Sequence, residues 1–470
     1  MSSIIVCGAG VVGLSAALLL LRDGHTVTVC ESDPAPPPAD PSRAWRSWER
    51  PGVAQFRQPH NLLPRFRRVL ADELPELIDR LVAAGCFEAS ALLPLPPSVT
   101  GYTPHPDDER FRFVTGRRPV VEAVFASAAE DAGVRVLRGT PIAGLLTGRP
   151  VLPGTPHVVG VRTRAGAELR ADLVVDATGR RTPSTRWLAD IDAPDPRTES
   201  EEGGFAYYTR YFTGPRQPER RGAPYTPFGT FSLLTIPGDN DTWSVTVVAR
   251  TGDAPLKALR DPACFTRVVQ ACPAQAHWLA GTPVTDIVAM AGVLDRRRRL
   301  VVDGRPVATG FAAVGDAWAS GNPTAARGLS VGLTHAQLLR DVLREHADDP
   351  ARFPPAWEQA TERVVAPFYQ DQVLADRARA AEMAPDRIAD ATPVATATSG
   401  FGAAAFHDAE VFRGLLETAT CLALPQEVLA RPDIRARIDA ATAHPARAHP
   451  ARELGPPGPD RARLLHLLTT

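Results

Sequence analysis

The sequence predicts an α/β protein with a Rossmann-like nucleotide-binding domain, an inserted antiparallel β-sheet domain and a helical C-terminal region. Three observations support this prediction. The chain opens on a β-branched strand, a glycine-rich turn and a helix. Strand patterns separated by Gly, Pro and Asp-Asn turns run from about Gly203 to Arg250, and helical patterns follow Pro354.

The first elements form a βαβ unit. Ser3 to Cys7 is β-branched and predicts a strand, Val11 to Arg22 has helical length, and His25 to Cys30 alternates as a second strand. Pro34 to Pro41 must be a loop, because consecutive prolines remove backbone donors. Further elements are expected as helices at Asp72–Gly85 and Val120–Ala132 and as strands at Val134–Leu137, Val158–Arg164 and Leu173–Asp176.

The middle of the chain predicts an inserted sheet, with strands at Phe205–Phe212, Thr230–Ile236 and Trp243–Val248. A buried strand at Val307–Val314 and a helix at Leu329–His346 then return to the first domain. The expected domains are a discontinuous nucleotide-binding domain (1–90, 115–186 and 290–346), a sheet domain (187–289 with 91–114), a helical region (350–442) and a mobile tail (443–470).

The composition excludes several classes of protein. The 470 residues carry 52 Lys+Arg, 53 Asp+Glu and 44% hydrophobic residues, which suits a soluble globular protein and excludes disorder, collagen and coiled coil. The balanced charge gives no field that would gather nucleic acid, so no such partner is expected. The strongest basic run, Arg296 to Arg299, is interpreted as a solvated turn or strand end.

The N-terminal stretch Ser2 to Leu21 is uncharged and imitates a membrane span. Its three glycines divide it into strand, turn and helix, and no basic residue precedes it, so neither export nor membrane insertion is expected. The six cysteines contain no CxxC pair and are interpreted as buried free thiols. A cytoplasmic location is therefore expected.

The turn Gly8-Ala-Gly10-Val-Val-Gly13, which includes Val12, follows a strand and opens a helix. The first glycine permits the tight turn, the second lets the backbone approach a pyrophosphate, and the third brings the helix against the strand. Glu31 ends the second strand, where its carboxylate can accept both hydroxyls of an adenosine ribose. A dinucleotide site is predicted, and the motif alone leaves NAD and FAD open.

A second segment carries the sequence Phe311-Ala-Ala-Val-Gly315-Asp316-Ala317, and a helix starts at Gly328. The segment resembles the Gly-Asp motif of FAD-dependent aromatic hydroxylases and related epoxidases. The resemblance implies that Asp316 binds the ribityl chain of FAD and that Pro323 lines the catalytic face. It also places the backbone amides of Gly328 and Leu329 near the N1–C2 edge of the flavin, where the helix dipole would stabilise negative charge.

Three more segments are similar to this superfamily. The run Asp172 to Arg186, with Gly179 at its centre, carries Thr178 in a form that looks like the polyether epoxidase and isoprenoid reductase branches. The runs Trp48 to His60 and Arg117-Arg118-Pro-Val-Val resemble the epoxidase-like branch, which makes Arg50 and Arg118 candidate cofactor contacts. The family implies an FAD-binding domain of the glutathione-reductase-like type.

The resemblance implies an FAD-dependent monooxygenase in which NAD(P)H reduces the flavin, O2 forms a C4a-hydroperoxide, and one oxygen atom passes to an apolar aromatic or alkene substrate. NAD(P)H either binds transiently or acts through a partner flavin reductase, since no second GxGxxG is present. Aromatic residues in Phe205–Phe212 and Tyr225–Trp243 suggest a substrate pocket, although such residues more often fill a core. No individual catalytic residue is predicted.

Several alternatives are weighed. An FAD-dependent reductase or dehydrogenase of an isoprenoid-like substrate stays open, as does a nucleotide-binding protein without turnover. Gly328-Leu-Ser330-Val-Gly332 matches a hydrolase pattern, but no strand directly precedes it, so a serine hydrolase is not expected. The histidines show no metal-binding spacing, and His60 is the one with a loop position worth following. A flavin halogenase is disfavoured, because Lys257 is the only lysine and lacks the expected context.

Overall fold

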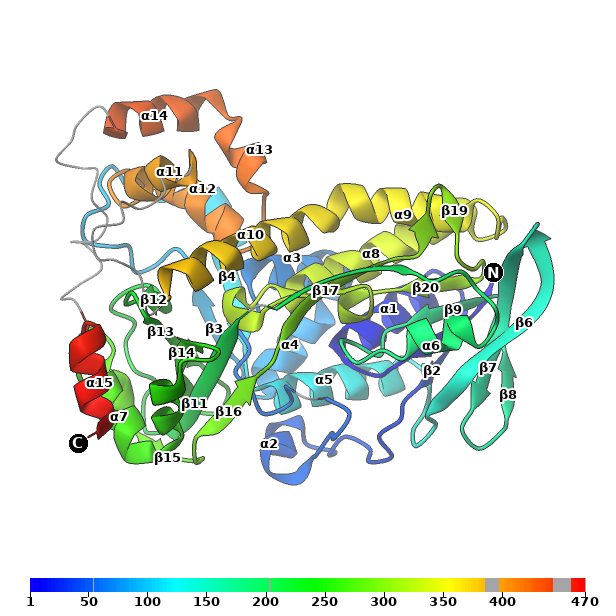
Figure 1. Cartoon of the computed structure of the whole chain (residues 1–470), viewed down its shortest axis with the longest axis horizontal. Helices are drawn as coiled ribbons and strands as arrows, with labels where there is room; N and C mark the ends of the chain where they lie inside the picture. Colours follow the sequence, from blue (N-terminus) through cyan, green and yellow to red (C-terminus); the bar gives the residue numbers. More distant parts are fainter. Residues whose placement is uncertain (54, 203, 385–396, 443–457, 470) are drawn as a thin grey trace.

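The computed structural model describes residues 1–469 except 54, 203, 385–396 and 443–457. Its first layer is a parallel five-stranded sheet in the order β20-β9-β1-β2-β5. Figure 1 shows this sheet near the N-terminus. The strands are β1 (Ser3–Cys7), β2 (Thr26–Cys30), β5 (Arg135–Leu137), β9 (Leu173–Asp176) and β20 (Phe311–Ala313).

Helices cover one face of the parallel sheet. Because side chains alternate along a strand, Ile4 and Val6 of β1 point into this helical layer. The layer holds α1 (Val11–Arg22), α3 (Pro64–Glu73), α4 (Glu76–Ala83), α5 (Arg118–Asp131) and α8 (Gly328–His346). The predicted βαβ opening is confirmed, and the uncharged N-terminal stretch is a strand, a turn and a helix.

The other face of the sheet carries a three-stranded antiparallel sheet, in the order β6-β7-β8, and helix α6 (Ser184–Ala189). Its strands are β6 (Ile142–Leu152), β7 (Thr155–Thr163) and β8 (Glu168–Arg170). The predicted strand at Val158–Arg164 is β7. It pairs antiparallel with β6 because a tight turn joins the two, whereas a parallel strand needs a long crossover.

A second, larger antiparallel sheet was predicted from the sequence and is confirmed. It lies at the opposite end of the molecule (Figure 1). One of its faces packs on helices α7 (Pro262–Gln270) and α15 (Arg461–Thr469). Its strands are β11 (Phe205–Thr213), β12 (Tyr225–Pro227), β13 (Phe231–Pro237), β14 (Thr242–Arg250), β15 (Thr282–Pro283) and β16 (Val288–Ala291). We call it the substrate sheet, after the role that the sequence predicts.

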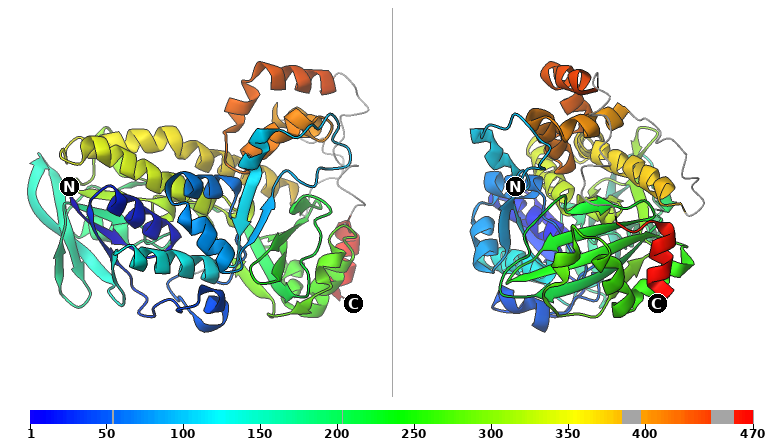
Figure 2. Two further views of the ribbon diagram at one scale, coloured as in Figure 1. Left: turned by 180° about the vertical axis from the view of Figure 1, so that it is seen from behind. Right: turned by 90° about the vertical axis from the view of Figure 1, so that its left-hand side faces the viewer.

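The chain that follows α8 forms mainly helices, as predicted. Figure 2 shows α11 to α14 as a lobe that stands apart from the two sheets. The lobe encloses Leu92 and Phe111 in its core, so this part of 91–114 packs on the helices and not on the substrate sheet. The helices are α9 (Phe353–Val364), α10 (Ala366–Glu382), α11 (Ala397–Ala405), α12 (Ala409–Ala419), α13 (Pro425–Leu429) and α14 (Pro432–Thr442).

Short elements complete the fold. Helix α2 (Ala44–Ser47) lies in the loop after β2, and a three-stranded sheet and two strand pairs border the layers. The three-stranded sheet has the order β10 (Arg197–Glu202), β17 (Leu294–Arg299) and β21 (Ala319–Ser320). The two pairs are β3 (Phe87–Ser90) with β4 (Arg112–Thr115), and β18 (Val301–Val302) with β19 (Arg305–Pro306).

Three sequence predictions need correction. The helix expected at Asp72–Gly85 is two helices, because α3 ends at Leu74 and Pro75 starts the next one. The strand expected at Val307–Val314 is a regular strand only over Phe311–Ala313. Within the expected mobile tail, α15 is a packed helix whose leucines at positions 464, 467 and 468 are buried at helical spacing, and residues 443–457 lie outside the described residues.

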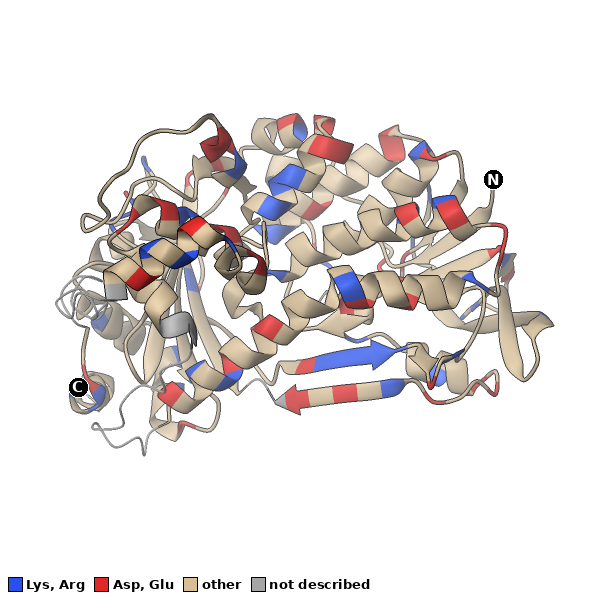
Figure 3. Cartoon of the chain, turned by 90° about the horizontal axis from the view of Figure 1, so that it is seen from above, with Lys and Arg blue, Asp and Glu red and all other residues tan. Residues whose placement is uncertain are grey.

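The basic run is also not a solvated turn. Arg296 to Arg299 lie on strand β17, which pairs with the acidic strand β10, and Figure 3 shows the two charged strands side by side. Arg297 is buried and forms an ion pair with Glu362, and buried Arg298 donates to the Ala317 carbonyl at 3.0 Å. The run is therefore a structural element of the interior.

Two further observations concern the whole chain. Among the described residues, no helix has the length and apolar character needed to cross a membrane. All six cysteines are free and buried, as predicted.

Candidate active site

A cavity of about 510 Å³ opens at the carboxyl ends of the parallel strands and extends to the substrate sheet. This edge is where open α/β sheets bind their ligands. The structure brings all the predicted site residues to the wall of this one cavity. They are Gly8, Gly10, Val12, Gly13, Glu31, Arg50, Arg118, Gly179, Gly315, Asp316, Pro323, Gly328 and Leu329.

The three glycines of the first turn occupy different surroundings. Gly8 has a φ of +107°, and a Cβ there would lie 2.6 Å from the Ala177 carbonyl oxygen. A Cβ on Gly13 would lie 2.1 Å from the Gly8 carbonyl oxygen, so the helix needs glycine to approach the strand. A Cβ on Gly10 would meet no protein atom within 4 Å, so Gly10 leaves room for a ligand to approach its backbone.

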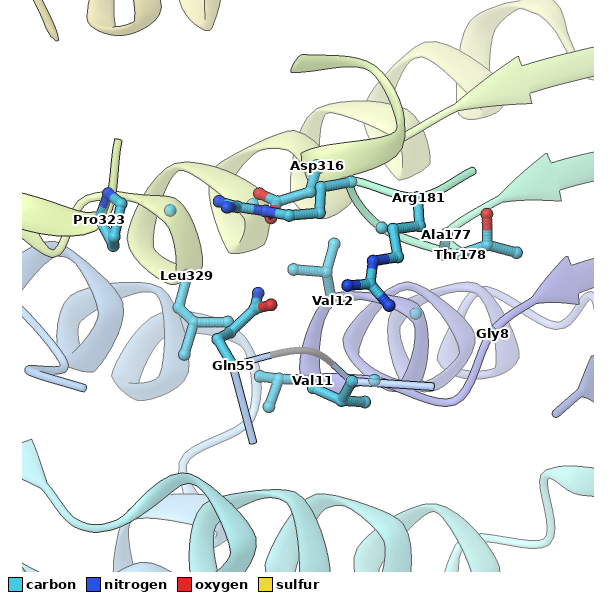
Figure 4. Close-up of a pocket in the computed structure, with 18 of the residues that line it drawn as sticks. Gly8, Val11, Val12, Gln55, Ala177, Thr178, Arg181, Asp316, Pro323 and Leu329 are labelled. Carbon is cyan, nitrogen blue, oxygen red and sulfur yellow. The ribbon is translucent and has the colours of Figure 1, made fainter. Parts of the chain in front are cut away.

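Two helices begin at the cavity without a side-chain cap. Gly10 is the N-cap of α1 and Arg327 is the N-cap of α8, and neither gives a capping hydrogen bond. The first N–H groups of a helix have no partner within it and carry partial positive charge. Figure 4 shows Val11 and Val12 of α1 and Leu329 of α8 around the same space. The two helix ends suit a pyrophosphate and an electron-rich ring, which fits the two parts of FAD.

Asp316 lies between these helix ends, with its side chain 26% exposed. Its Oδ2 is 3.8 Å from Nε of Arg180, which leaves carboxylate oxygen free to accept hydrogen bonds from a polyol chain. Gly315 has a φ of +57°, and its N–H donates to Nδ1 of His335 at 3.1 Å. The Gly-Asp turn is thereby fixed from behind.

His335 is a buried support of this turn that the sequence analysis did not identify. Because Nδ1 accepts a hydrogen bond, the ring proton is on Nε2, which donates to Oγ1 of Thr361 at 3.2 Å. Burial lowers the pKa of His335 to about 3, so the ring is neutral. It also stacks on Trp357 with 4.5 Å between ring centroids.

Glu31 lines the cavity, but its carboxylate is already saturated. Oε2 accepts from the Ala9 N–H at 2.8 Å and from Arg50, while Oε1 accepts from the Asp33 N–H at 2.9 Å and from the Ser32 hydroxyl at 3.1 Å. A carboxylate has about four acceptor positions. A ribose hydroxyl would therefore have to replace one of these donors, and the Ser32 hydroxyl makes the longest bond.

Arg50 and Arg118 belong to one buried ion network. Arg50 contacts Glu31, Asp33 at 3.3 Å and Glu122 at 2.5 Å, and Arg118 contacts the other oxygen of Glu122 at 2.6 Å. Glu122 is fully buried on α5 and joins the two arginines. The network braces the loop after β2 against α5, and Arg50 has three carboxylate partners before any ligand binds.

His60 ends this network at the cavity wall. Its Nε2 accepts from Nη1 of Arg118 at 3.0 Å, since a guanidinium can only donate, and its Nδ1 donates to the Gln58 carbonyl at 2.9 Å. Burial, with the nearby Arg118 charge, lowers the pKa of His60 to about 3. His60 is therefore a neutral imidazole with both nitrogens occupied.

The substrate sheet closes the far end of the cavity with alternate residues of its strands. Of the aromatic residues at Phe205–Phe212, only Tyr207 lines the cavity; Tyr208 and Phe212 point into the opposite core. The other cavity-lining side chains of this sheet are Thr209, Leu234, Thr246 and Met290. The end wall is mixed, with hydroxyl groups as well as apolar groups.

A loop that carries Pro323 is tied to this wall. The Tyr207 hydroxyl donates to Oδ1 of Asn322 and lies 2.8 Å from Oγ1 of Thr324. Behind the loop are two buried carboxyl groups, Asp295 and Asp376. Burial raises the pKa of Asp376 to about 7, and the nearby Asp295 charge adds to the shift.

Glu122 and His335 were not predicted as site residues, and Tyr207 was predicted only as one of several aromatic residues in Phe205–Phe212. Glu122 was visible as one acid inside an apolar helix pattern, and Tyr207 as one aromatic position of an alternating strand. The partner of each comes from a distant segment, so the sequence pattern could not assign their roles.

The N-terminal part of the chain is similar to a family of flavin enzymes. Residues 3–98 match the family model described as FAD dependent oxidoreductase. The chain is 28% identical to Protein Rv3254 of Mycobacterium tuberculosis in an alignment of 374 positions that covers 72% of each of the two chains.

Solved structures share the fold at lower identity. Pseudomonas aeruginosa PqsL in complex with 2-aminobenzoylacetate matches with a TM-score of 0.60 and 19% identity over 81% of this chain and 96% of that chain. Another PqsL structure, described as a probable FAD-dependent monooxygenase, matches with a TM-score of 0.57 and 20% identity over the same shares. The myxobacterial chondrochloren halogenase CndH matches with a TM-score of 0.60 and 21% identity over 89% of this chain and 96% of that chain. The chain thus combines an N-terminal segment similar to FAD dependent oxidoreductases with a fold that is shared by a probable FAD-dependent monooxygenase and an FAD-dependent halogenase.

Proposed function

We propose that the protein is an NAD(P)H-driven monooxygenase that transfers one oxygen atom from O2 to an aromatic or alkene substrate. The observation that carries this proposal is the continuity of the cavity, which joins the Gly8–Gly13 turn, the Asp316 turn and the substrate sheet. An FAD bound along the Gly8–Gly13 turn and the Asp316 turn would present its flavin ring to the substrate sheet. Bound FAD, once reduced, supplies the activation of O2.

The residues of this chain would bind and orient the FAD and would shield its reacting end from water. The N–H groups at the start of α8, beside Gly328 and Leu329, would stabilise negative charge on the reduced ring. Asp316 would hold the ribityl hydroxyls, and the α1 N-terminus at Gly10 would hold the diphosphate. Leu234, Met290 and Phe368 would limit access of water to the reacting end.

We do not propose halogenation, although the solved halogenase CndH shares the fold. The one lysine, Lys257, is exposed on the outer side of the substrate sheet domain and does not line the cavity. The reductase alternative has the same cofactor and the same cavity, so only the fate of oxygen separates it from the proposal.

The test uses the purified full-length protein loaded with FAD. We expect a yellow protein that NAD(P)H, alone or with a flavin reductase, bleaches under nitrogen and that air restores. A screen of aromatic and polyene compounds under ¹⁸O2 should then give a product with one labelled oxygen atom. Reduced product without label would favour the reductase, and an apoprotein that takes up no FAD would overturn the cofactor assignment.

A further inference from the structure

Among the arginines that line the cavity, one lies where a diphosphate is expected and has no side-chain partner among the described residues. Six arginines line the cavity. Arg50 contacts three carboxylates, Arg118 contacts Glu122, and Arg327 contacts Asp371 at 2.5 Å. Arg180 donates to the Gly321 carbonyl at 3.1 Å and is near Asp316. The remaining two arginines, Arg164 and Arg181, make no side-chain hydrogen bond or ion pair with the described part of the chain.

Arg181 belongs to the loop that follows β9 and faces the glycine turn. A Cβ on Gly8 would lie 2.6 Å from the Ala177 carbonyl oxygen and 3.2 Å from Cα of Thr178. The loop therefore lies directly against the glycine turn. Figure 4 shows the Arg181 guanidinium directed from the loop toward the side of the cavity where α1 begins, near Val12. Arg164 lies elsewhere, beside Pro141, whose carbonyl accepts its backbone N–H at 2.8 Å.

The charge balance at this end of the cavity calls for such a cation. A dinucleotide diphosphate carries two negative charges, and a helix N-terminus offers about half a positive charge. Arg50 adds no net charge here, because Glu31, Asp33 and Glu122 surround it. A free guanidinium suits phosphate oxygens well, since its N–H groups can donate two parallel hydrogen bonds.

We infer that Arg181 binds the diphosphate of FAD from the side opposite the α1 N-terminus, and that Arg50 holds the surrounding loop in place. This inference rests on the proposed occupation of the cavity by FAD. A nicotinamide dinucleotide also carries a diphosphate, and the experiment separates the two sources. Arg181 is exposed at the cavity wall, so its bond to the cofactor is open to competition by salt.

The test compares the FAD affinity of R181Q, R181K and wild-type protein by quenching of flavin fluorescence. R149Q is the matched control, because Arg149 is also exposed and unpartnered but lies on β6 away from the cavity. We expect R181Q to raise the Kd for FAD by about 10- to 100-fold, as for loss of a charge-assisted hydrogen bond. R181K should recover part of the affinity, and R149Q should stay within about twofold of wild type.

Two further readouts do not depend on turnover. The Kd of wild type should rise more steeply than that of R181Q between about 50 and 500 mM NaCl. The melting temperature of the apoprotein should be the same for R181Q and wild type, because Arg181 has no partner to lose. An R181Q protein that binds FAD as tightly as wild type would overturn the inference.

The source of the diphosphate is tested by flavin reduction at saturating FAD. If R181Q raises the NAD(P)H concentration needed for half-maximal reduction and leaves the Kd for FAD unchanged, the arginine serves the nicotinamide dinucleotide and the inference is wrong. Failure of the proposed function looks different, because wild-type protein itself would then not bind FAD.

Discussion

The hydroxyl of Tyr207 on strand β11 donates a hydrogen bond to Oδ1 of Asn322, in the loop that carries Pro323. The bond ties the substrate sheet to the loop beside the proposed flavin face. Burial raises the pKa of Tyr207 well above its ordinary value, so the hydroxyl remains a donor at any working pH.

Removal of this hydroxyl should loosen the loop without disturbing the fold. We expect Y207F to lower the free energy of unfolding of the FAD-loaded protein by about 1 kcal/mol, as for loss of one hydrogen bond. Flavin fluorescence should also rise as the loop moves away from the ring. Y208F is the control, since Tyr208 points into the opposite core. Equal effects of the two variants would show that the Tyr207–Asn322 bond has no special role.

The glycines of the first turn should separate stability from cofactor binding. G13A places a methyl group 2.1 Å from the Gly8 carbonyl oxygen, so we expect the apoprotein to lose about 1–3 kcal/mol or more of stability. G10A meets no protein atom, so it should leave the melting temperature of the apoprotein near that of wild type. Its Kd for FAD should rise by about 10-fold or more, because the methyl group would stand where the diphosphate approaches. Chemical denaturation and fluorescence titration measure the two effects, and unchanged FAD affinity in G10A would contradict the placement of the diphosphate.

The Asp376 carboxyl predicts a dependence of stability on pH. Its pKa is raised to about 7 in the folded protein by burial, against about 3.9 in an unfolded chain. Between these values the folded state holds one proton more than the unfolded state, so this contribution to stability is complete below about pH 4 and is lost as the pH rises through 7. D376N should flatten the fall in unfolding free energy between about pH 4 and 7. An unchanged pH profile in D376N would assign the fall to another group.

Glu122 should be a strong determinant of stability. E122Q leaves Arg50 and Arg118 without their shared buried carboxylate, and we expect a loss of about 3–5 kcal/mol. The control is E130Q on the same helix, where Glu130 is half exposed and pairs with Arg138 at 2.9 Å; its loss should be about 0–1 kcal/mol. Urea denaturation of the two variants decides this, and similar losses would mean that the buried network contributes little.

Much of the fold, and the set of residues predicted to line the cavity, could be predicted from local sequence patterns. The turn at Gly8–Gly13 has a backbone requirement that only glycine meets, and the Gly315-Asp316 turn has another, so both were visible as residue types in order. Strands β11, β13 and β14 were predicted because their turn residues are local signals. These elements depend little on distant parts of the chain.

The features that sequence could not supply depend on partners far apart in the chain. The saturation of Glu31 needs the Ala9 N–H and Arg50, and the buried position of Arg297 needs Glu362 from α9. Helix α15 was assigned to a mobile tail because nine residues at the end of a polar stretch give a weak signal. Contact with α7 and with residues 254–260, in the outer core of the substrate sheet, stabilises this helix.

The position of α15 has a practical consequence for work with this protein. Leu464, Leu467 and Leu468 shield the apolar side of the strands whose other side borders the cavity. A shortened version that stops after residue 442 would expose this apolar surface to water and promote aggregation. An affinity tag that follows α15 would begin on the outer side of the sheet, opposite the side that borders the cavity.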